Sequence, residues 1–312
     1  MVPEPIVMPT FATSPADEAA LPITASASPT LALQPSASPA ALERSTGRVE
    51  IAFKRRGPVT TLARLHQAGC GKARLPRPTT ATHAEAVVIN LAGGLTGGDR
   101  LDWQVTWQEG AVATVSGQAA EKIYRAPGAS TALIETRLDV APEATALWLP
   151  QETIFFDRAR LCRKNRFSVA RGGRLLAVEA TIMGRRAMGE TVTSGLFDES
   201  VEVRYADRLL LAERQRYRGR LADLLAHPAV GHGATALVSL LYVGEAAAGR
   251  LGAVRDALGE TPAAATAPDP DLLVVRWLAA SPTGLRNHLV AALFALTSAL
   301  GLPRQLPRVW SC

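Results

Sequence analysis

Two carboxylates flank a short apolar run in the middle of the chain. Glu152 precedes the segment 153–156 (Thr-Ile-Phe-Phe), and Asp157 follows it. A pair of carboxylic acids can perform general acid–base chemistry, as in glycoside hydrolysis. The two positions have opposite parity, so a regular strand would place them on opposite faces, and only a bulge or a solenoid corner would reunite them. An edge strand with charged ends is the stronger interpretation, and the catalytic pair is the alternative.

A glycine-rich segment, 93–99 (GGLTGGD), directly follows the apolar run 87–91. Such a loop binds phosphate when a helix follows it, because the N-terminal amides of the helix hold the anion. Neither a P-loop nor a dinucleotide-binding pattern is present, and the next segment, 101–108, alternates as a strand. We therefore predict a tight double turn in which glycine supplies positive φ or a close backbone approach, with Asp99 capping the turn or facing a cavity.

Two further segments combine charge with turn or aromatic residues. In the segment 184–190 (GRRAMGE), Glu190 is expected to form a local ion pair with an arginine of the turn or, alternatively, to contact a metal or a partner. The segment 121–125 (EKIYR) is a compact charged and aromatic patch. Both are turn or strand-end segments, where functional side chains commonly lie.

The histidines and cysteines form no recognisable metal or catalytic site. The five histidines are scattered, and no His/Cys cluster has the spacing of structural zinc. Cys162 has basic neighbours within 160–164 that would lower its pKa, but with no nearby histidine or second cysteine we predict a structural role. No Gly-x-Ser-x-Gly elbow is present. The residues alone therefore identify no convincing catalytic centre.

The elements that position these residues are mostly strands. From Arg48 to about Arg218, apolar and polar residues alternate, which is typical of strands with one buried face. The pair Gly172-Gly173 between two such runs is typical of a hairpin turn. These patterns predict a large antiparallel β body. The clearest alternating runs are 48–54, 101–108, 134–140, 176–182 and 201–205.

The pattern changes after Gly233, where an α+β portion begins. We predict strands over 234–244 and 272–278, an Ala-rich helix over 245–259 and a Pro/Ala loop over 261–270. Ser281-Pro282 is expected to open a second helix that Gly301 and Pro303 end. Its leucines share one face, which we expect to pack against the β body rather than a partner. They are Leu285, Leu289, Leu293, Leu296 and Leu300.

Composition sets the domain limits. Residues 1–46 are rich in Pro, Ala and Ser and are predicted to be a disordered leader, whereas 47–312 form one domain with a β body (47–232) and an α+β tail (233–312). The longest apolar stretch, 289–302, is shorter than the roughly 20 residues of a membrane span, and the N-terminus lacks the basic start of a secretory signal. We expect a cytoplasmic protein, and three well-separated cysteines fit a reducing compartment.

The net charge of +6 hides an asymmetry. Residues 1–43 carry four acidic and no basic side chains, so the remainder carries +10. A basic body suggests an acidic partner, of which nucleic acid is one candidate. However, the basic residues are spread along the chain and aromatic residues make up only 5% of it, whereas nucleic-acid platforms interleave the two kinds. A solvated basic surface is therefore the favoured interpretation.

The order of the motifs is more informative than any one of them. Over about residues 47–310 this order resembles the UreD (UreH) family of urease accessory proteins, although Asn90-Leu91-Ala92 stands where many relatives have an Asn-Pro-type element. The motifs are Gly93-Gly94-x-x-Gly97-Gly98-Asp99, Lys122-x-Tyr124-Arg125, Trp148-Leu149-Pro150-Gln151-Glu152-Thr153-x-Phe155-x-Asp157, Gly184-Arg185-x-x-x-Gly189-Glu190 and Pro307-Arg308-Val309-Trp310.

The resemblance implies a fold and a non-enzymatic role. The family's fold is a β-helix-like stack of strands with helices near the C-terminus, so we expect a mainly β protein of stacked antiparallel sheets with an α+β C-terminal portion of about two helices. UreD-type proteins bind apo-urease and assemble with UreF and the GTPase UreG to insert nickel into urease. A resident cofactor, a nucleic-acid partner and a membrane partner are not expected.

The resemblance also suggests how nickel would meet this chain. Ni²⁺ binds imidazole and thiolate firmly and carboxylate more weakly, so a protein that passes nickel onward should avoid the first two. We hypothesise that Asp99, Glu152, Asp157 and Glu190 line a route for transient Ni²⁺, and that the other motif residues are structural. The alternatives are a β-helical carbohydrate-active enzyme that uses Glu152 and Asp157, and a basic nucleic-acid binder.

Overall fold

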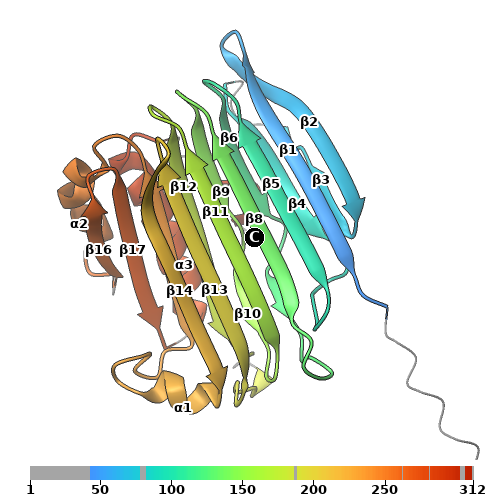
Figure 1. The fold of residues 1–312 in the computed structure, drawn as a ribbon. Helices are drawn as coiled ribbons and strands as arrows, with labels where there is room; N and C mark the ends of the chain where they lie inside the picture. Colours follow the sequence, from blue (N-terminus) through green and yellow to red (C-terminus); the bar gives the residue numbers. More distant parts are fainter. Residues whose placement is uncertain are drawn as a thin grey trace, which may run out of the picture. The chain divides into compact units, whose positions relative to one another are not determined.

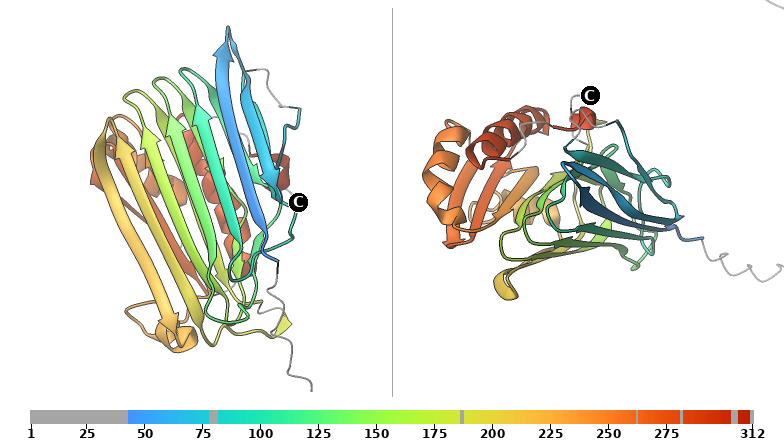
Figure 2. Two further views of the ribbon diagram at one scale, coloured as in Figure 1. Left: turned by 45° about the vertical axis from the view of Figure 1, so that its right-hand side comes forward. Right: turned by 90° about the horizontal axis from the view of Figure 1, so that it is seen from above.

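The computed structural model describes residues 43–77, 82–185, 188–261, 263–280, 282–302 and 306–310. Two β-sheets lie face to face, with helices on the outer side of one of them (Figures 1 and 2). Sheet A contains β1 (Thr46–Arg56), β2 (Val59–Gly69), β5 (Arg100–Trp107), β8 (Ala132–Val140), β11 (Arg160–Val169), β13 (Gly195–Tyr205) and β14 (Arg208–Gly219). Of the leader predicted over residues 1–46, residues 1–42 lie outside the described residues. Strand β1 begins at Thr46, the last residue of the predicted leader.

Sheet B and the helices complete the fold. The strands of sheet B are β3 (Gly71–Arg74), β4 (Ala84–Asn90), β6 (Val112–Gly117), β7 (Glu121–Ile123), β9 (Thr145–Leu149), β10 (Thr153–Phe155), β12 (Arg174–Met183), β15 (Ala236–Val243), β16 (Ala263–Asp269) and β17 (Leu272–Ala279). The helices are α1 (Leu221–Ala226), α2 (Leu251–Leu258) and α3 (Pro282–Ala299), with 3₁₀ turns η2 (Ala247–Arg250) and η3 (Arg308–Trp310).

The central strands form the coils of a solenoid. Three successive pairs, β5–β6, β8–β9 and β11–β12, each cross from sheet A to sheet B, and each coil stacks on the next through parallel strand pairs. The predicted mainly β, β-helix-like stack is thus confirmed. The antiparallel direction is wrong for the central strands and holds only toward the edges of the two sheets, such as β1–β2, β13–β14 and β12–β15. Alternation reports which face is buried and is the same for either strand direction.

The turn at Gly172-Gly173 corrects a second prediction. It joins β11 to β12, which belong to different sheets, so it is an arc within one coil and not a hairpin. Gly172 has φ +78°, and a Cβ on Gly173 would lie 2.8 Å from the carbonyl oxygen of Ala141 in the neighbouring arc. Glycine is required here because stacked arcs bring their backbones close together and leave no room for a Cβ. A tight hairpin turn also favours glycine, so the sequence alone does not distinguish the two structures.

Two apolar cores share sheet B. The first lies between the sheets and contains the inward faces of sheet A strands, such as Val49, Ile51 and Phe53 of β1. The second lies between sheet B and the helices and contains all five leucines of the α3 stripe, each at most 1% exposed. The prediction that this stripe packs against the β body is therefore confirmed. The predicted cap at Ser281 and stop at Pro303 lie outside the described residues.

Strand β16 replaces the loop predicted over 261–270. Among the described strands it pairs with β17 alone, and its register is interrupted between Thr266 and Asp269, around Pro268. An edge strand tolerates proline at such an irregularity because the missing N–H is not needed by a second neighbour. β15 and β17 continue sheet B beyond β12, so the tail and the body share one sheet. Within the described ranges, no helix combines the length and the apolar character that a membrane crossing requires.

Candidate functional site

The sequence motifs meet on neighbouring rungs of sheet B. Leu95 bridges Ile123, Ile123 of β7 pairs with Phe155 of β10, and Phe155 pairs with Met183 of β12. The glycine turn, the 121–125 patch, the segment around Asp157 and the turn at Gly184 therefore lie side by side although they are far apart in the sequence. A solenoid achieves this because equivalent positions of successive coils stack.

The glycine turn is a tight double turn, as predicted. Gly93 and Gly98 have φ +73° and +96°. A Cβ on Gly94 would lie 2.4 Å from Cε2 of Tyr124, whose hydroxyl donates to the carbonyl oxygen of Gly93 at 3.0 Å. Glycine therefore lets the aromatic ring of the next rung seat directly on the turn.

Asp99 closes this turn and ties it to the start of the sheet. Its two carboxylate oxygens accept hydrogen bonds from the backbone amides of Ser45 (2.8 Å) and Thr96 (2.7 Å), and the residue is 5% exposed. Of the two predicted roles for Asp99, capping is the one these contacts describe. Both carboxylate oxygens are occupied by N–H donors.

An aromatic and arginine cluster covers the end of β10. The ring of Phe156 meets that of Tyr124 edge to face at 5.1 Å, and the guanidinium of Arg185 lies 4.1 Å from its centroid. Arg185 also binds Glu190 through two nitrogens at 2.9 and 3.2 Å, and this pairing holds the pKa of Glu190 below its usual value. The predicted local ion pair at Glu190 is confirmed.

Asp157 lies next to Glu190 in the same cluster. Its Oδ1 accepts from the amides of Thr193 (2.7 Å) and Ser194 (3.1 Å) and from the Thr193 hydroxyl, while its own amide donates to Glu190 at 3.4 Å. Burial acts to raise the pKa of Asp157, but these hydrogen bonds outweigh it and hold the pKa below its usual value. Asp157 is thus suited to remain ionised and not to donate a proton.

Glu152 is held by a different element. Arg286 of α3 donates to both of its carboxylate oxygens at 3.1 Å and to the side-chain oxygen of Gln151 at 2.7 Å. The same guanidinium lies 5.4 Å from the ring centroid of Trp310, whose indole N–H donates to the carbonyl oxygen of Leu149. The Trp-Leu-Pro-Gln-Glu motif therefore anchors the C-terminal segment.

The four predicted carboxylates fall into three groups. Asp157 and Glu190 adjoin each other, Asp99 caps the glycine turn, and Glu152 binds α3. The pKa of Asp157 is lowered, which argues against its acting as a general acid, and Glu152 is neutralised by an arginine. Among the described residues, no three His, Cys, Asp or Glu side chains group closely enough to hold a metal ion.

A cavity of about 250 Å³ lies between the two sheets and was not foreseen from the sequence. Its walls come from both sheets and include the predicted motif residues Trp148 and Gln151. Its other polar walls are formed by Asn90, Glu121, Lys122, Thr136, Thr153, Arg163 and Glu179. Glu152 lies in the sequence between the lining residues Gln151 and Thr153. The cavity therefore adjoins the contact of Arg286 with Gln151 and Glu152.

Glu121 is the carboxylate at one side of this cavity. Its Oε1 accepts a hydrogen bond from the side-chain amide of Asn90 at 3.0 Å. Burial raises the pKa of Glu121 to about 7, against smaller opposing effects of Asn90 and Lys122. The carboxyl is therefore able to exchange a proton near neutral pH.

An ionic network forms another part of the wall. Arg163, 4% exposed, binds Glu199 at 2.5 Å and Glu179 at 3.0 Å, and it donates to the hydroxyls of Thr153 and Thr181. Burial raises the pKa of Glu179, whereas Arg163 acts in the opposite direction. Arg163 thus joins β11 and β13 of sheet A to β10 and β12 of sheet B.

The remaining predicted residues are turn or surface residues. Gly184 and Gly189 have φ +83° and +74°. Lys122 of β7 and Arg125 just after it are exposed, and their carbonyl oxygens accept hydrogen bonds from the glycine turn. Cys162 is a free thiol whose pKa burial raises, so the lowered pKa expected from its basic neighbours is wrong. Desolvation outweighs the neighbouring positive charge because Asp198 partly cancels that charge.

Comparison with known proteins agrees with the motif order. The profile of the family described as "UreD urease accessory protein" matches residues 45–311. A "Urease accessory protein UreD" of Rhizobium etli is 43% identical over 269 residues, which cover 86% of this chain and 96% of that protein. The protein of the same name from Agrobacterium fabrum is 40% identical, over 88% of this chain and 93% of that protein. The one from Brucella suis is 38% identical, over 86% of this chain and 95% of that protein. The chain therefore belongs to the UreD family of urease accessory proteins.

Proposed function

We propose that this chain is a non-enzymatic urease maturation factor. It acts as a scaffold that binds apo-urease together with UreF-like and UreG-like accessory proteins and assists nickel insertion. The observation that supports this role best is the convergence of the motif segments on adjacent rungs, next to a polar cavity between the sheets. A rigid stack of coils suits a scaffold because it presents loops in fixed positions.

Nickel is the cargo in this proposal and is not a resident cofactor. Carboxylates without imidazole or thiolate partners bind Ni²⁺ weakly, which suits release to another protein. In this proposal the cavity carboxylates Glu121 and Glu179 line the route. The four carboxylates proposed from the sequence, Asp99, Glu152, Asp157 and Glu190, do not line this cavity. A carboxyl with a pKa near 7 can release its proton when a cation arrives and regain it when the cation leaves.

Assembly is tested by co-expressing this chain with UreF-like and UreG-like proteins and the urease subunits. We expect a co-purifying complex and a urease that contains nickel, whereas deletion of this chain should leave urease without nickel. If no complex forms and urease is loaded equally well without this chain, the proposed function is wrong. Metal content of purified urease is measured by mass spectrometry, separately from activity.

The route is tested with Glu121→Gln, which keeps the shape and the hydrogen bond with Asn90 but removes the charge. We expect slower nickel loading of urease with an unchanged yield of complex. Glu109→Gln, at an exposed turn, is the matched control and should load at the wild-type rate. Equal loading rates for the two variants would show that the route does not use Glu121.

A further inference from the structure

Within the described residues, no helix or second sheet covers the outer face of sheet A. Figure 1 shows this face toward the viewer, and Figure 2 shows the described helices α2 and α3 on the side of sheet B. From β1 through β5, β8 and β11 to β13, the strands of sheet A run parallel. Its strands alternate buried and accessible residues, so this face is polar and within reach of another molecule.

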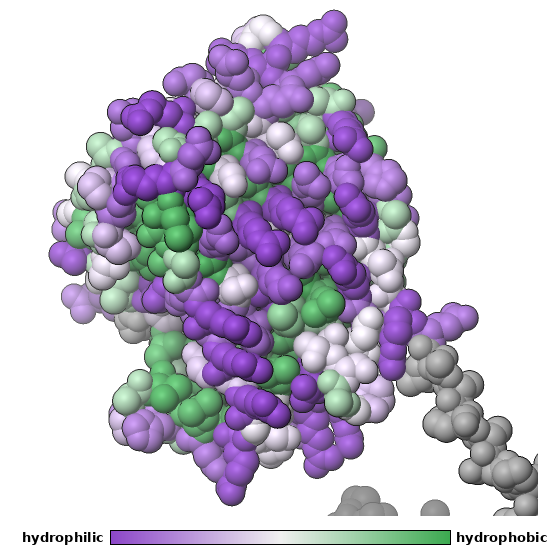
Figure 3. Space-filling view, in the orientation of Figure 1, coloured by the Kyte–Doolittle hydropathy of each residue, from purple (hydrophilic) through white to green (hydrophobic). Residues whose placement is uncertain are grey.

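Charged side chains lie in rows across this face, which Figure 3 shows as hydrophilic bands over sheet A. One row runs in register through Arg48, Asp102, Glu135 and Lys164 and continues through Ser200 to Arg214. Aligned strands place side chains on neighbouring strands about 5 Å apart, so positive and negative side chains lie close together across the face.

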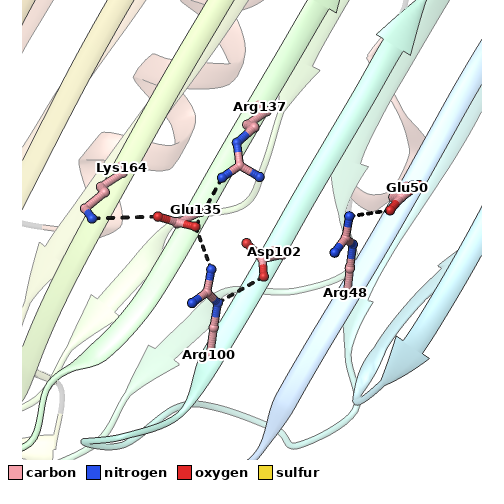
Figure 4. Close-up of polar contacts among 7 residues, drawn as sticks. All are labelled: Arg48, Glu50, Arg100, Asp102, Glu135, Arg137 and Lys164. Atoms are coloured by element: carbon pink, nitrogen blue, oxygen red, sulfur yellow. Dashed lines mark hydrogen bonds and ion pairs between the residues drawn. The ribbon is translucent and has the colours of Figure 1, made fainter.

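Cations outnumber carboxylates within these rows. Glu135 is shared by Arg100 at 2.7 Å, Arg137 at 3.4 Å and Lys164 at 3.7 Å (Figure 4). Asp198 is likewise shared by two arginines of β14. Because one carboxylate cannot neutralise two or three cations, the face keeps positive charge that solvent or a partner must compensate.

Two arginines occupy adjacent positions in the middle of the face. Arg137 of β8 and Arg166 of β11 are directly in register. Arg166 is exposed and makes no ion pair within the described part of the chain. On its other side Arg166 is in register with Glu202, whose carboxylate binds Arg204. Like charges opposite each other on neighbouring strands destabilise a sheet, and a further anionic group would relieve this pair.

We propose that the outer face of sheet A is the docking surface for an acidic surface of a folded protein partner, whose carboxylates neutralise Arg137 and Arg166. This rests on the proposed function, which requires protein partners. The face is large enough: seven strands about 4.8 Å apart and eight residues of about 3.3 Å span roughly 750 Å², close to the about 800 Å² that one partner buries in a standard interface.

The pattern of this face favours a protein over a nucleic acid. Carboxylates such as Asp102, Glu135 and Asp139 alternate with the cations and would repel a phosphate backbone. The described outward positions of β5, β8 and β11 contain no aromatic side chain on which a base could stack. A protein surface, by contrast, can match both signs of charge.

The central test is the double variant Arg137→Glu/Arg166→Glu. Its binding to apo-urease, to the UreF-like protein and to the UreG-like protein is measured separately by calorimetry at several salt concentrations. We expect at least tenfold weaker binding of one partner and a shallower salt dependence. Arg171→Glu/Arg220→Glu makes the same charge change at exposed arginines outside this face and should bind as the wild type.

The outcomes separate the two proposals. If the wild type binds a partner and the double variant binds it equally well, the docking surface is wrong and the proposed function stands. If the wild type binds none of the three proteins, the proposed function fails and the docking surface fails with it. Circular dichroism of both double variants establishes that each is folded.

Lys164 provides a second, independent readout. A carbodiimide joins a lysine directly to a carboxylate that contacts it. Besides the internal link between Lys164 and Glu135, which lie 3.7 Å apart, we expect a cross-linked peptide that contains Lys164 and an acidic segment of the partner. Lys164→Arg should abolish the cross-link and keep the affinity. Absence of the cross-link in a formed complex, or binding of a 30-base-pair DNA duplex that the Arg137→Glu/Arg166→Glu variant loses, would overturn the proposal of a protein partner.

Discussion

Arg286 donates from one guanidinium nitrogen to both carboxylate oxygens of Glu152, at 3.1 Å each, across 134 positions of sequence. The pair fastens helix α3 to the loop that precedes β10. Because Glu152 is 5% exposed, its charge is compensated inside the protein and not by bulk water.

Removal of either Arg286 or Glu152 alone should therefore lower the stability of the folded protein. We expect Arg286→Met to lower the free energy of unfolding by about 3 kcal/mol, because it leaves a buried carboxylate without its cation. Urea denaturation measures the loss. Arg171→Met, at an exposed arginine that makes no side-chain hydrogen bond or ion pair with the described residues, should change stability by less than about 0.5 kcal/mol. Adding Glu152→Gln to Arg286→Met should recover part of the loss, and no recovery would contradict the role of the pair.

Glu121 should make the protein less stable as the pH rises. The folded-state pKa of about 7 lies above the ordinary value of 4.5, so between these values the folded chain keeps a proton that the unfolded chain has released. Stability is then lost as pH rises from about 4.5 to about 7 and is constant above. We expect Glu121→Gln to flatten this decline and to be more stable by roughly 1–3 kcal/mol at pH 8. Identical pH profiles of unfolding for wild type and variant would contradict this.

His83 should act in the opposite direction. Burial lowers its pKa from 6.5 to about 4, and its Nε2 lies 2.7 Å from the hydroxyl of Thr114. Between pH 6.5 and about 4 the unfolded chain binds a proton that the folded chain excludes, so stability falls as the pH falls. His83→Asn should remove this dependence, which thermal unfolding at pH 4.5 and pH 7 measures. A variant that loses stability on acidification as steeply as the wild type would show that another group is responsible.

The contact between Gly94 and Tyr124 can be separated from backbone strain. Gly94 and Gly128 have similar φ angles, +153° and +148°. A Cβ at Gly94 would lie 2.4 Å from the ring of Tyr124 and 2.9 Å from the backbone oxygen of Lys122, whereas nothing lies within 4 Å of that position at Gly128. We expect Gly94→Ala to cost about 1–3 kcal/mol more than Gly128→Ala. The difference is measured by urea denaturation of the two variants. Equal costs would mean that both the Tyr124 ring and the Lys122 backbone shift without cost.

Much of the fold could be predicted because one-sided burial leaves a period-two pattern. The run 48–54 predicts β1, and its inward residues are indeed buried. The pattern does not report strand direction or the sheet to which a strand belongs, so the parallel coils and the arc at Gly172 were missed. Both depend on partners that are far away in the sequence.

The candidate site was harder to predict, because its contacts join distant segments. Nothing near Glu152 in the sequence identifies Arg286 as its partner. One signal was available: Arg163 has the same parity as Leu161 and Phe167, so alternation places a charge on the inward face of β11. A charge at an inward position requires a buried partner, and this indicates the network at the cavity.

The aligned rungs at Leu95, Ile123, Phe155 and Met183 have a consequence for how this protein changes over evolutionary time. Each coil contacts mainly the coils before and after it, so a substitution on one rung is compensated most directly on the adjacent rung. Co-varying positions in this family should therefore be separated by about the length of one coil, and whole-coil insertions should disturb the stack less than the gain or loss of a single residue.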